Sequence, residues 1–207
     1  MNNQKMKILV VLAVFLSVSE SGCSNKKNPR DTPSETLESF PITDSYIMTI
    51  AQKNDGSILE SSPVTKGIFK GCFKRIYGVS NGARYEAILK GKNLVEFGQI
   101  APQDSFAAFG DMGVGLGLGA MMVGSYAMAH GNDTTEFMAS DSAKQLGSNG
   151  NTCAQQFASG QPTYDFDFND TKVICRKTRN SYIVEVMPLS TYKKIQQDTS
   201  KTLQELN

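Results

Sequence analysis

The sequence contains a single histidine, no tryptophan and only four cysteines among its 207 residues. No second histidine or cysteine stands at metal-ligand spacing from His130, so we expect no metal site there, although Asp133 and Glu136 lie nearby. No two cysteines form a C-x-x-C pair, which argues against a zinc ribbon or a thioredoxin-like motif. No G-x-S-x-G motif is present, and a serine or cysteine nucleophile would have only His130 as its base. We therefore expect a non-enzymatic protein without a cofactor.

The net charge is close to zero, and long apolar runs are scarce. The chain has 21 lysines and arginines against 20 aspartates and glutamates, which gives no case for nucleic-acid binding. The N-terminal apolar run of about ten residues is shorter than the roughly 20 that a membrane-spanning helix needs. A segment that starts like a calcium loop, Asp165-x-Asp167-x-Asn169, has Asp170 where that loop requires glycine and Arg176 where it requires glutamate. These features argue against a permanent N-terminal span and an EF-hand.

What the N-terminus does contain is a leader. Lys5 and Lys7 lie at the start of the apolar run, and the small residues Ser21 and Gly22 lead into Cys23. This order is typical of a secretory signal peptide. The end of the leader resembles bacterial lipoprotein precursors, in which a small-residue pair precedes a cysteine that is lipidated and becomes the mature N-terminus. The resemblance implies that residues 1–22 are removed and that Cys23 carries acyl chains such as palmitate.

Two neighbouring positions bear on this resemblance. Glu20 stands where the lipoprotein family usually carries leucine or another apolar residue. The alternative is an ordinary secreted protein, cut near Ser19 or Ser21, in which Cys23 keeps its thiol. Ser24, directly after the cysteine, implies sorting to the outer membrane, with the body facing the periplasm.

The segment after the leader has the composition of a flexible tether. Residues 24–39 contain one apolar residue, two prolines and mixed charge, which is too little apolar surface to fold. We predict a lipidated cysteine and a disordered tether over residues 23–43. A single β-rich periplasmic domain over residues 44–207 is expected to follow.

The pattern of this domain predicts a small antiparallel α+β fold with hairpins. Asn81-Gly82 is a strong hairpin signal, and residues 177–181 are expected to form a second hairpin turn. A stripe of apolar residues from Leu189 to Leu206 predicts a C-terminal amphipathic helix that packs on the chain's own sheet, with packing on a partner as the alternative. The predicted strands are Tyr46–Ala51, Gly67–Tyr77, Arg84–Leu89, Leu94–Ile100, the segment containing Tyr164, Phe166 and Phe168, Lys172–Arg176 and Tyr182–Met187.

A glycine-rich apolar segment, Met112–Ala129, interrupts the two β-rich halves. It contains five glycines and no charge. If the segment is a helix, small residues four apart let another helix approach closely. In this respect it resembles the glycine-zipper segments of bacterial envelope proteins, which implies membrane insertion or self-association. The contact residues would then be Gly113, Gly115, Gly117, Gly119 and Gly124. A buried core element, either a helix or a strand with one bare face, is the alternative.

The cysteines predict one disulfide. If Cys23 is lipidated, three cysteines remain, and we favour the pair Cys153–Cys175, which closes a loop of moderate length. Cys72 would then be buried or would pair with another chain. Other pairings that include Cys72 stay open, because sequence alone does not fix disulfide connectivity.

A cluster of basic residues lies between residues 66 and 92. Lys70, Lys74, Arg75 and Arg84 belong to it, and Glu86 is its one acidic residue. Such a cluster is expected to contact an anionic surface, such as lipid headgroups, cell-wall polymer or an acidic protein. An ordinary solvated face is the alternative.

The sequence thus predicts a non-enzymatic cell-envelope lipoprotein. It would be a structural or binding subunit of an outer-membrane or periplasmic assembly or a homo-oligomer, attached to the membrane through its N-terminal lipid. The alternative is a secreted effector or toxin that inserts residues 112–129 into a target membrane. An extracytoplasmic enzyme would have to rely on carboxylates such as Asp165 and Asp167, because histidine is so scarce.

Overall fold

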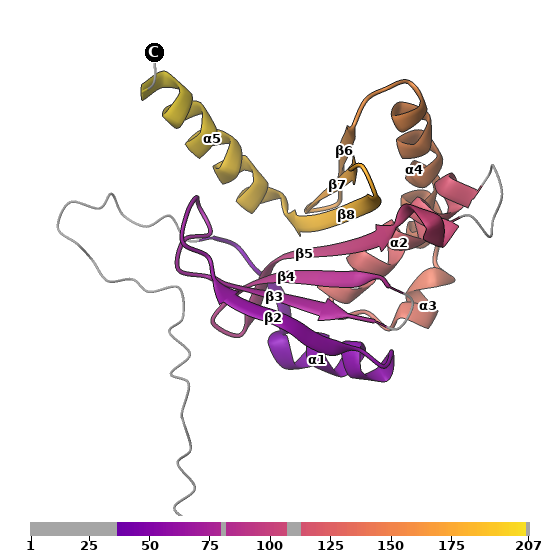
Figure 1. The fold of residues 1–207 in the computed structure, drawn as a ribbon, viewed down its shortest axis with the longest axis horizontal. Helices are drawn as coiled ribbons and strands as arrows, with labels where there is room; N and C mark the ends of the chain where they lie inside the picture. Colours follow the sequence, from indigo (N-terminus) through magenta and orange to yellow (C-terminus); the bar gives the residue numbers. More distant parts are fainter. Residues whose placement is uncertain (1–36, 80–81, 107–112, 206–207) are drawn as a thin grey trace, which may run out of the picture.

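The computed structural model describes residues 37–79, 82–106 and 113–205, and its body is built on one antiparallel sheet (Figure 1). Along the sheet the strand order is β2-β3-β4-β5-β8-β7-β6, and β1 pairs with β5 beside this path. The predicted α+β class with antiparallel strands and a C-terminal helix is confirmed. The described elements are β1 (Phe40–Thr43), α1 (Asp44–Lys53), β2 (Ser57–Pro63), β3 (Phe73–Gly78), β4 (Arg84–Lys90), β5 (Asn93–Pro102), α2 (Gly113–Ala129), α3 (Thr134–Met138), α4 (Asp141–Ala158), β6 (Thr163–Phe168), β7 (Thr171–Lys177), β8 (Ser181–Pro188) and α5 (Leu189–Glu205).

Two antiparallel meanders, β2–β5 and β6–β8, join edge to edge through β5 and β8. Helices α2, α3 and α4 form the long connection between them. The strands predicted for both halves are found in β4 to β8, because these segments alternate apolar and polar residues and are joined by short turns. The hairpin predicted at Asn81-Gly82 joins β3 and β4, which pair in the antiparallel sense. Gly82 has a φ of 82°, and Asn81 lies outside the described residues.

The strand predicted over Gly67–Tyr77 begins only at Phe73. The residues before it form turns, in which Gly67 and Gly71 have φ values of 72° and 85°. Glycine adopts such values at no steric cost, whereas other residues rarely do. The first half of the predicted strand was therefore wrong, and its glycines were the sign of a turn.

Helix α1 occupies the segment in which the sequence predicted a strand, Tyr46–Ala51. Asp44 lies in the first turn and Lys53 in the last, a charge placement that complements the helix dipole. Ile47 and Ala51, four residues apart, share its buried side. The prediction was wrong because a short apolar run without alternation does not distinguish a strand from a helix.

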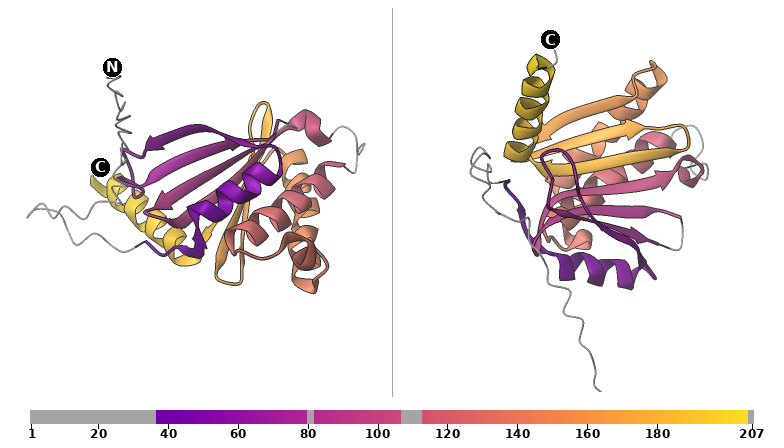
Figure 2. Two further views of the ribbon diagram at one scale, coloured as in Figure 1. Left: turned by 90° about the horizontal axis from the view of Figure 1, so that it is seen from below. Right: turned by 60° about the vertical axis from the view of Figure 1, so that its left-hand side comes forward.

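Helices α1, α2 and α4 lie on one side of the sheet, as the two views of Figure 2 show. Helix α2 is apolar on every side, the pattern of a buried helix. It packs against α4, β5 and β8, and together with α1 these elements enclose the main core. The glycine-rich segment is therefore a core helix in this fold.

The folded body begins before residue 44, the boundary that the sequence predicted. Strand β1 lies within residues 23–43, yet Phe40 and Ile42 are buried. Strand β8 pairs with β5 from Phe97 onward, while β1 pairs with its first residues, Asn93 and Leu94. Strand β1 therefore pairs with the same edge of β5 as β8 does, next to the end of β8. The folded body includes residues that composition alone assigned to the tether.

Helix α5 projects away from the body (Figure 1). Only Thr191 is buried, so the expected packing of the whole helix on the sheet was wrong beyond its first turns. Thr191 donates a hydrogen bond of 2.8 Å to the carbonyl of Glu38, and the Ser190 hydroxyl donates to the Glu38 carboxylate. Lys172 of β7 lies 4.7 Å from the centre of the Tyr192 ring. These contacts place the first described residues of the body beside the start of α5.

Candidate functional site: the open face of the sheet

The side of the sheet opposite α1, α2 and α4 carries the most unusual arrangement of side chains. Five adjacent strands each present one isoleucine and at least one charged residue there, as their pairing register shows. No described helix covers these positions, and only the first turns of α5 approach β7 and β8. We call this surface the open face; it consists of Lys74 and Ile76 (β3), Glu86 and Ile88 (β4), Glu96 and Ile100 (β5), Glu185 and Ile183 (β8), and Arg176 and Ile174 (β7).

Cross-strand register brings the open-face charges together. Lys74 Nζ lies 3.5 Å from the Glu86 carboxylate, and Arg176 binds the carboxylate of Glu185. Gly98 lies between Glu86 and Glu185 in the register of the sheet. A Cβ atom at Gly98 would come within 3.2 Å of Glu185 Cγ, so the missing side chain leaves room for Glu185 to lie over β5.

Glu96 stands between these pairs with no ion-pair partner among the described residues. Burial, followed by the neighbouring charges of Glu185 and Glu86, raises the pKa of Glu96 to about 8, although Arg176 and Lys74 act in the opposite direction. Burial also raises the pKa of Glu185. The open face therefore holds a carboxyl group that titrates near neutral pH. A cation placed beside it would stabilise its ionised form.

The predicted basic cluster is divided between the two sides of the sheet. Lys74 and Arg75 are neighbours on β3 and point to opposite faces. Lys74 is paired with Glu86, and Arg75 is bound to Asp44 on the helix side. Lys70 lies in the turn before β3 and Arg84 at the start of β4, and both are exposed. Contact with an anionic surface through all four residues would thus require both faces at once, so this prediction is not carried further.

The partner of Arg75 belongs to a network that fixes α1 to the sheet. Arg75 and the hydroxyl of Tyr77 both donate to the carboxylate of Asp44, the latter at 2.9 Å. Arg75 Nη1 also lies 3.6 Å from the sulfur of Met48. Burial and the charge of Asp44 raise the pKa of the Tyr77 hydroxyl, which stays protonated as a donor. The network is part of the fold and positions one side of α1.

The glycines predicted to contact a membrane or a second chain are mostly used inside this one. A Cβ atom at Gly115 would meet Asn151 of α4, and one at Gly119 would meet the carbonyl of Gly147. From the other side, a Cβ atom at Gly150 would come within 2.6 Å of Gly119 Cα. Gly113 is buried, and a Cβ atom at Gly117 would meet the ring of Phe106. The small-residue spacing therefore serves close packing of α2 on α4.

Gly124 is the exception among the five predicted contact glycines. A Cβ atom there would meet nothing within 4 Å. It continues a narrow stripe of α2 with Leu116 and Ala120, both of which are exposed. This stripe contains the exposed residues of α2 and is the part of the helix open to contact with a membrane or another chain.

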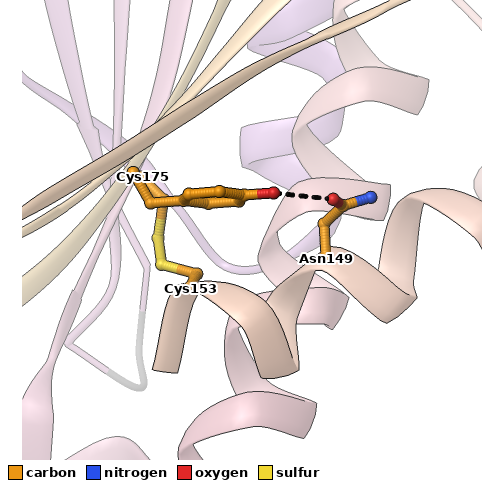
Figure 3. Close-up of a disulfide and its surroundings, with 4 residues drawn as sticks. Asn149, Cys153 and Cys175 are labelled. Carbon is orange, nitrogen blue, oxygen red and sulfur yellow. Dashed lines mark hydrogen bonds between the residues drawn. A yellow bond between two sulfur atoms is a disulfide. The ribbon is translucent and has the colours of Figure 1, made fainter. Parts of the chain in front are cut away.

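The favoured disulfide is present. Cys153 of α4 and Cys175 of β7 are bonded, with their Cα atoms 6.7 Å apart (Figure 3). One turn earlier on α4, the side-chain amide oxygen Oδ1 of Asn149 accepts a hydrogen bond of 3.1 Å from the Tyr164 hydroxyl. The two links fasten α4 to the strands at the β6 edge. Cys72 is buried, 1% exposed, and is also disulfide-bonded, while Cys23 lies outside the described residues.

The groups weighed for catalysis have structural partners. One ring nitrogen of His130 lies 2.9 Å from the carbonyl of Tyr126 and the other 3.1 Å from the Thr171 hydroxyl, and burial lowers the pKa of this histidine. Asp165 and Asp167 on edge strand β6 both pair with Lys172. Among the described residues, no group of three histidine, cysteine, aspartate or glutamate side chains is placed to hold a metal ion.

Sequence reasoning missed the three glutamates of the open face. A signal was available, because Glu86, Glu96 and Glu185 each interrupt an apolar strand sequence as its single carboxylate. Their convergence depends on the pairing of β5 with β8, two strands about 80 residues apart in the chain, which no local pattern specifies.

No family model, curated protein or solved structure matches this chain. Within the described residues, none of the helices combines the length and apolarity needed to cross a membrane.

Proposed function

We propose that this chain is a non-enzymatic binding subunit of the bacterial cell envelope, held at the outer membrane by a lipid on Cys23 and facing the periplasm. The leader, the small-residue pair before Cys23 and the tether composition support the anchor. The open face carries the binding half of the proposal, because eight of its ten side chains are partly or fully exposed, while Ile76 and Ile100 are buried.

The composition of the open face favours a protein partner. Its isoleucines alternate with three glutamates, one lysine and one arginine, and Arg84 and Lys172 lie on the same side of the sheet, so apolar area and charges of both signs are interspersed. A lipid surface would instead select a continuous apolar or basic patch, and nucleic acid would select a basic one. The mixed pattern is that of a protein interface, in which polar groups fix the register and apolar groups supply contact area.

The other residues also favour binding over catalysis. His130, Asp165 and Asp167 are engaged in contacts that hold the fold. The alternative of a secreted membrane-inserting effector receives no support from α2, because 13 of its 17 residues are buried in the body. Insertion would require α2 to leave its packing against α4 and the sheet.

The anchor is tested by the intact mass of the mature protein isolated from native membranes, with Cys23→Ser as the control. A chain that begins at Cys23 and carries a diacyl- or triacyl-sized addition is the expected result. A lipid-free chain cut elsewhere would overturn the anchor. Cys72 is disulfide-bonded, and Cys153 and Cys175 are bonded to each other, so a lipid on Cys23 requires Cys72 to pair with another chain. A lipid-free chain whose mass is four hydrogens below that of the reduced chain would contain two intrachain disulfides and would overturn the anchor.

The open face is tested separately by site-specific photocrosslinking in cells that make the protein. A photoreactive residue at Ile174 or Ile183 should give a discrete adduct, because both positions lie in the open face. Lys144 and Gln155 of α4 are exposed control positions away from it. Adducts at the control positions alone, or at none of the positions, would remove the binding role while leaving the anchor test unaffected.

A further inference from the structure

A cavity opens at the opposite edge of the sheet from the disulfide. It has a volume of about 320 Å³ and is lined by residues of α1 and of the start of β2. Ile58 pairs with Tyr77, whose ring faces the helix side, so the cavity is separate from the open face. Its lining residues are Met48, Ala51, Gln52, Gly56, Ser57, Ile58 and Tyr77.

The cavity adjoins an unpaired strand edge. Strand β2 is the last strand of the described sheet and pairs only with β3. All its residues are exposed except Ser62, which is half-buried. Ile58 and Leu59 are 43% and 58% exposed, a high value for large apolar side chains. The outer backbone N–H and C=O groups of such an edge are satisfied either by water or by another strand.

We propose that β2 and the cavity beside it bind an extended peptide segment of another protein, which adds a strand to the edge and places one apolar side chain in the cavity. Strand addition supplies backbone hydrogen bonds, and a pocket beside the edge supplies side-chain specificity. Met48 is an adaptable wall for an apolar side chain, and Arg75 and Asp44 position it from behind. This surface goes beyond the proposed binding at the open face.

The charge of β2 decides which segment fits. Glu60 is the central residue of β2 and is exposed, and its one described contact is with the Ser62 hydroxyl at 2.9 Å. Two copies of β2 paired symmetrically would place Glu60 against Glu60, and like charges across a strand pair are unfavourable. The favoured occupant is therefore a different chain, with an apolar residue for the cavity and a lysine or arginine near Glu60.

The test is selection of random decapeptides displayed on phage against the full mature chain, followed by fluorescence-anisotropy titration of the enriched peptides. We expect enriched sequences that combine one large apolar residue with a lysine or arginine. Gln52→Trp should close the cavity and weaken binding at least tenfold. Lys53→Trp, on the same exposed turn but outside the cavity lining, should change it less than threefold.

A second pair of variants separates the cavity from the other side of the strand. Ile58→Asp should weaken binding at least tenfold, because Ile58 lines the cavity, whereas Leu59→Asp should have a smaller effect, since Leu59 lies over Gly78 on the opposite side. Hydrogen exchange should show protection of amides in Ser57–Pro63 on binding.

Three outcomes would overturn the proposal: no enrichment above an unselected library, equal binding by all four variants, or protection at β6 instead of β2. A concentration-dependent dimer in ultracentrifugation that Gln52→Trp abolishes would replace the peptide by a second copy, against the charge argument. The open-face variant Arg176→Ala should bind the peptide as the wild type does. The peptide test and the crosslinking test therefore fail independently.

Discussion

Helices α2 and α5 are both 17 residues long and have opposite surroundings. Thirteen residues of α2 are buried, whereas in α5 only Thr191 is buried. Each glycine of α2 lowers helix propensity by up to about 1 kcal/mol, so α2 depends on the packing around it. Helix α5 has ordinary helix-forming residues and leaves the body after its first turns. The comparison shows that one helix is specified by its neighbours and the other mainly by its own sequence, which predicts how each responds to substitution.

The largest loss of stability is expected when the disulfide that holds α4 beside α2 is removed. The double variant Cys153→Ser/Cys175→Ser breaks the covalent link between β7 and α4, the helix on which α2 packs. For a loop of 22 residues, loss of the disulfide should lower the free energy of unfolding by about 3 kcal/mol. Denaturant titration under non-reducing conditions measures it. A loss below about 1 kcal/mol would mean that packing alone holds α4 in place.

The next effect compares one substitution at two positions of α2. Gly119→Ala should destabilise the protein by about 2 kcal/mol, because the added Cβ meets backbone atoms of Gly147 that have no room to move. Gly124→Ala should be neutral or stabilise it by up to about 1 kcal/mol, because the space around Gly124 is open and alanine favours helix. Unfolding midpoints of the two variants decide the matter. Equal effects would contradict the close contact between α2 and α4.

A third prediction concerns the pH dependence of stability, and it compares Glu96 on the open face with an exposed glutamate on an edge strand. In the folded state the pKa of Glu96 is about 8, well above its value in an unfolded chain. The folded state therefore keeps a proton that the unfolded state releases, and stability should fall as pH rises from about 5 to about 8, then level off. Glu96→Gln should flatten this decline and add about 1 kcal/mol at pH 8, a value reduced for partial solvent exposure.

The control for that experiment is Glu60→Gln, which removes an exposed carboxylate on edge strand β2. It should leave the pH dependence of the unfolding midpoint unchanged. If both variants flatten the curve, or if neither does, Glu96 does not hold the proton. Glu185, whose pKa burial also raises, contributes in the same direction and accounts for any decline that remains in Glu96→Gln.

The smallest effect is expected in α5. Gln197→Gly lies in an exposed turn and should weaken the helix locally by about 1 kcal/mol. The global unfolding midpoint should stay within error of the wild type, because α5 opens without the core. Hydrogen exchange of α5 amides should quicken, while that of α2 amides should not change. A clear drop in the midpoint would show that α5 belongs to the cooperative core.

These contrasts also explain what the sequence could and could not predict. Strands β6, β7 and β8 were predictable because alternation and short turns are local signals. Helix α4 was missed because its buried positions are mostly small: Ala143, Gly150 and Cys153 accompany only two large apolar residues, Leu146 and Phe157, so its apolar stripe is weak. The spacing of these residues was nevertheless helical, and Ser140 caps the helix through the backbone N–H of Ala143.

The glycine segment illustrates the remaining limit. Its spacing correctly indicated a close helix–helix approach, but nothing in the pattern says whether the second helix belongs to the same chain. Gly147 and Gly150, the glycines of α4 that contact Gly119, lie 28 and 31 residues beyond it in a segment that gave no clear helix signal. The carboxylates of the open face escaped prediction for a similar reason, since β5 and β8 meet only through the tertiary fold.

The hydrogen bonds between Glu38 and the first turn of α5 also have a mechanical consequence. A pull transmitted along a chain that enters at residue 37 loads these bonds first, and then the short β1 ladder on β5. Neither lies on the path through Cys153–Cys175. Peeling six or seven residues from this corner would lengthen the connection by about 20 Å at roughly 3.3 Å per residue. The corner would act as an extensible link that yields under load and spares the disulfide-bonded core.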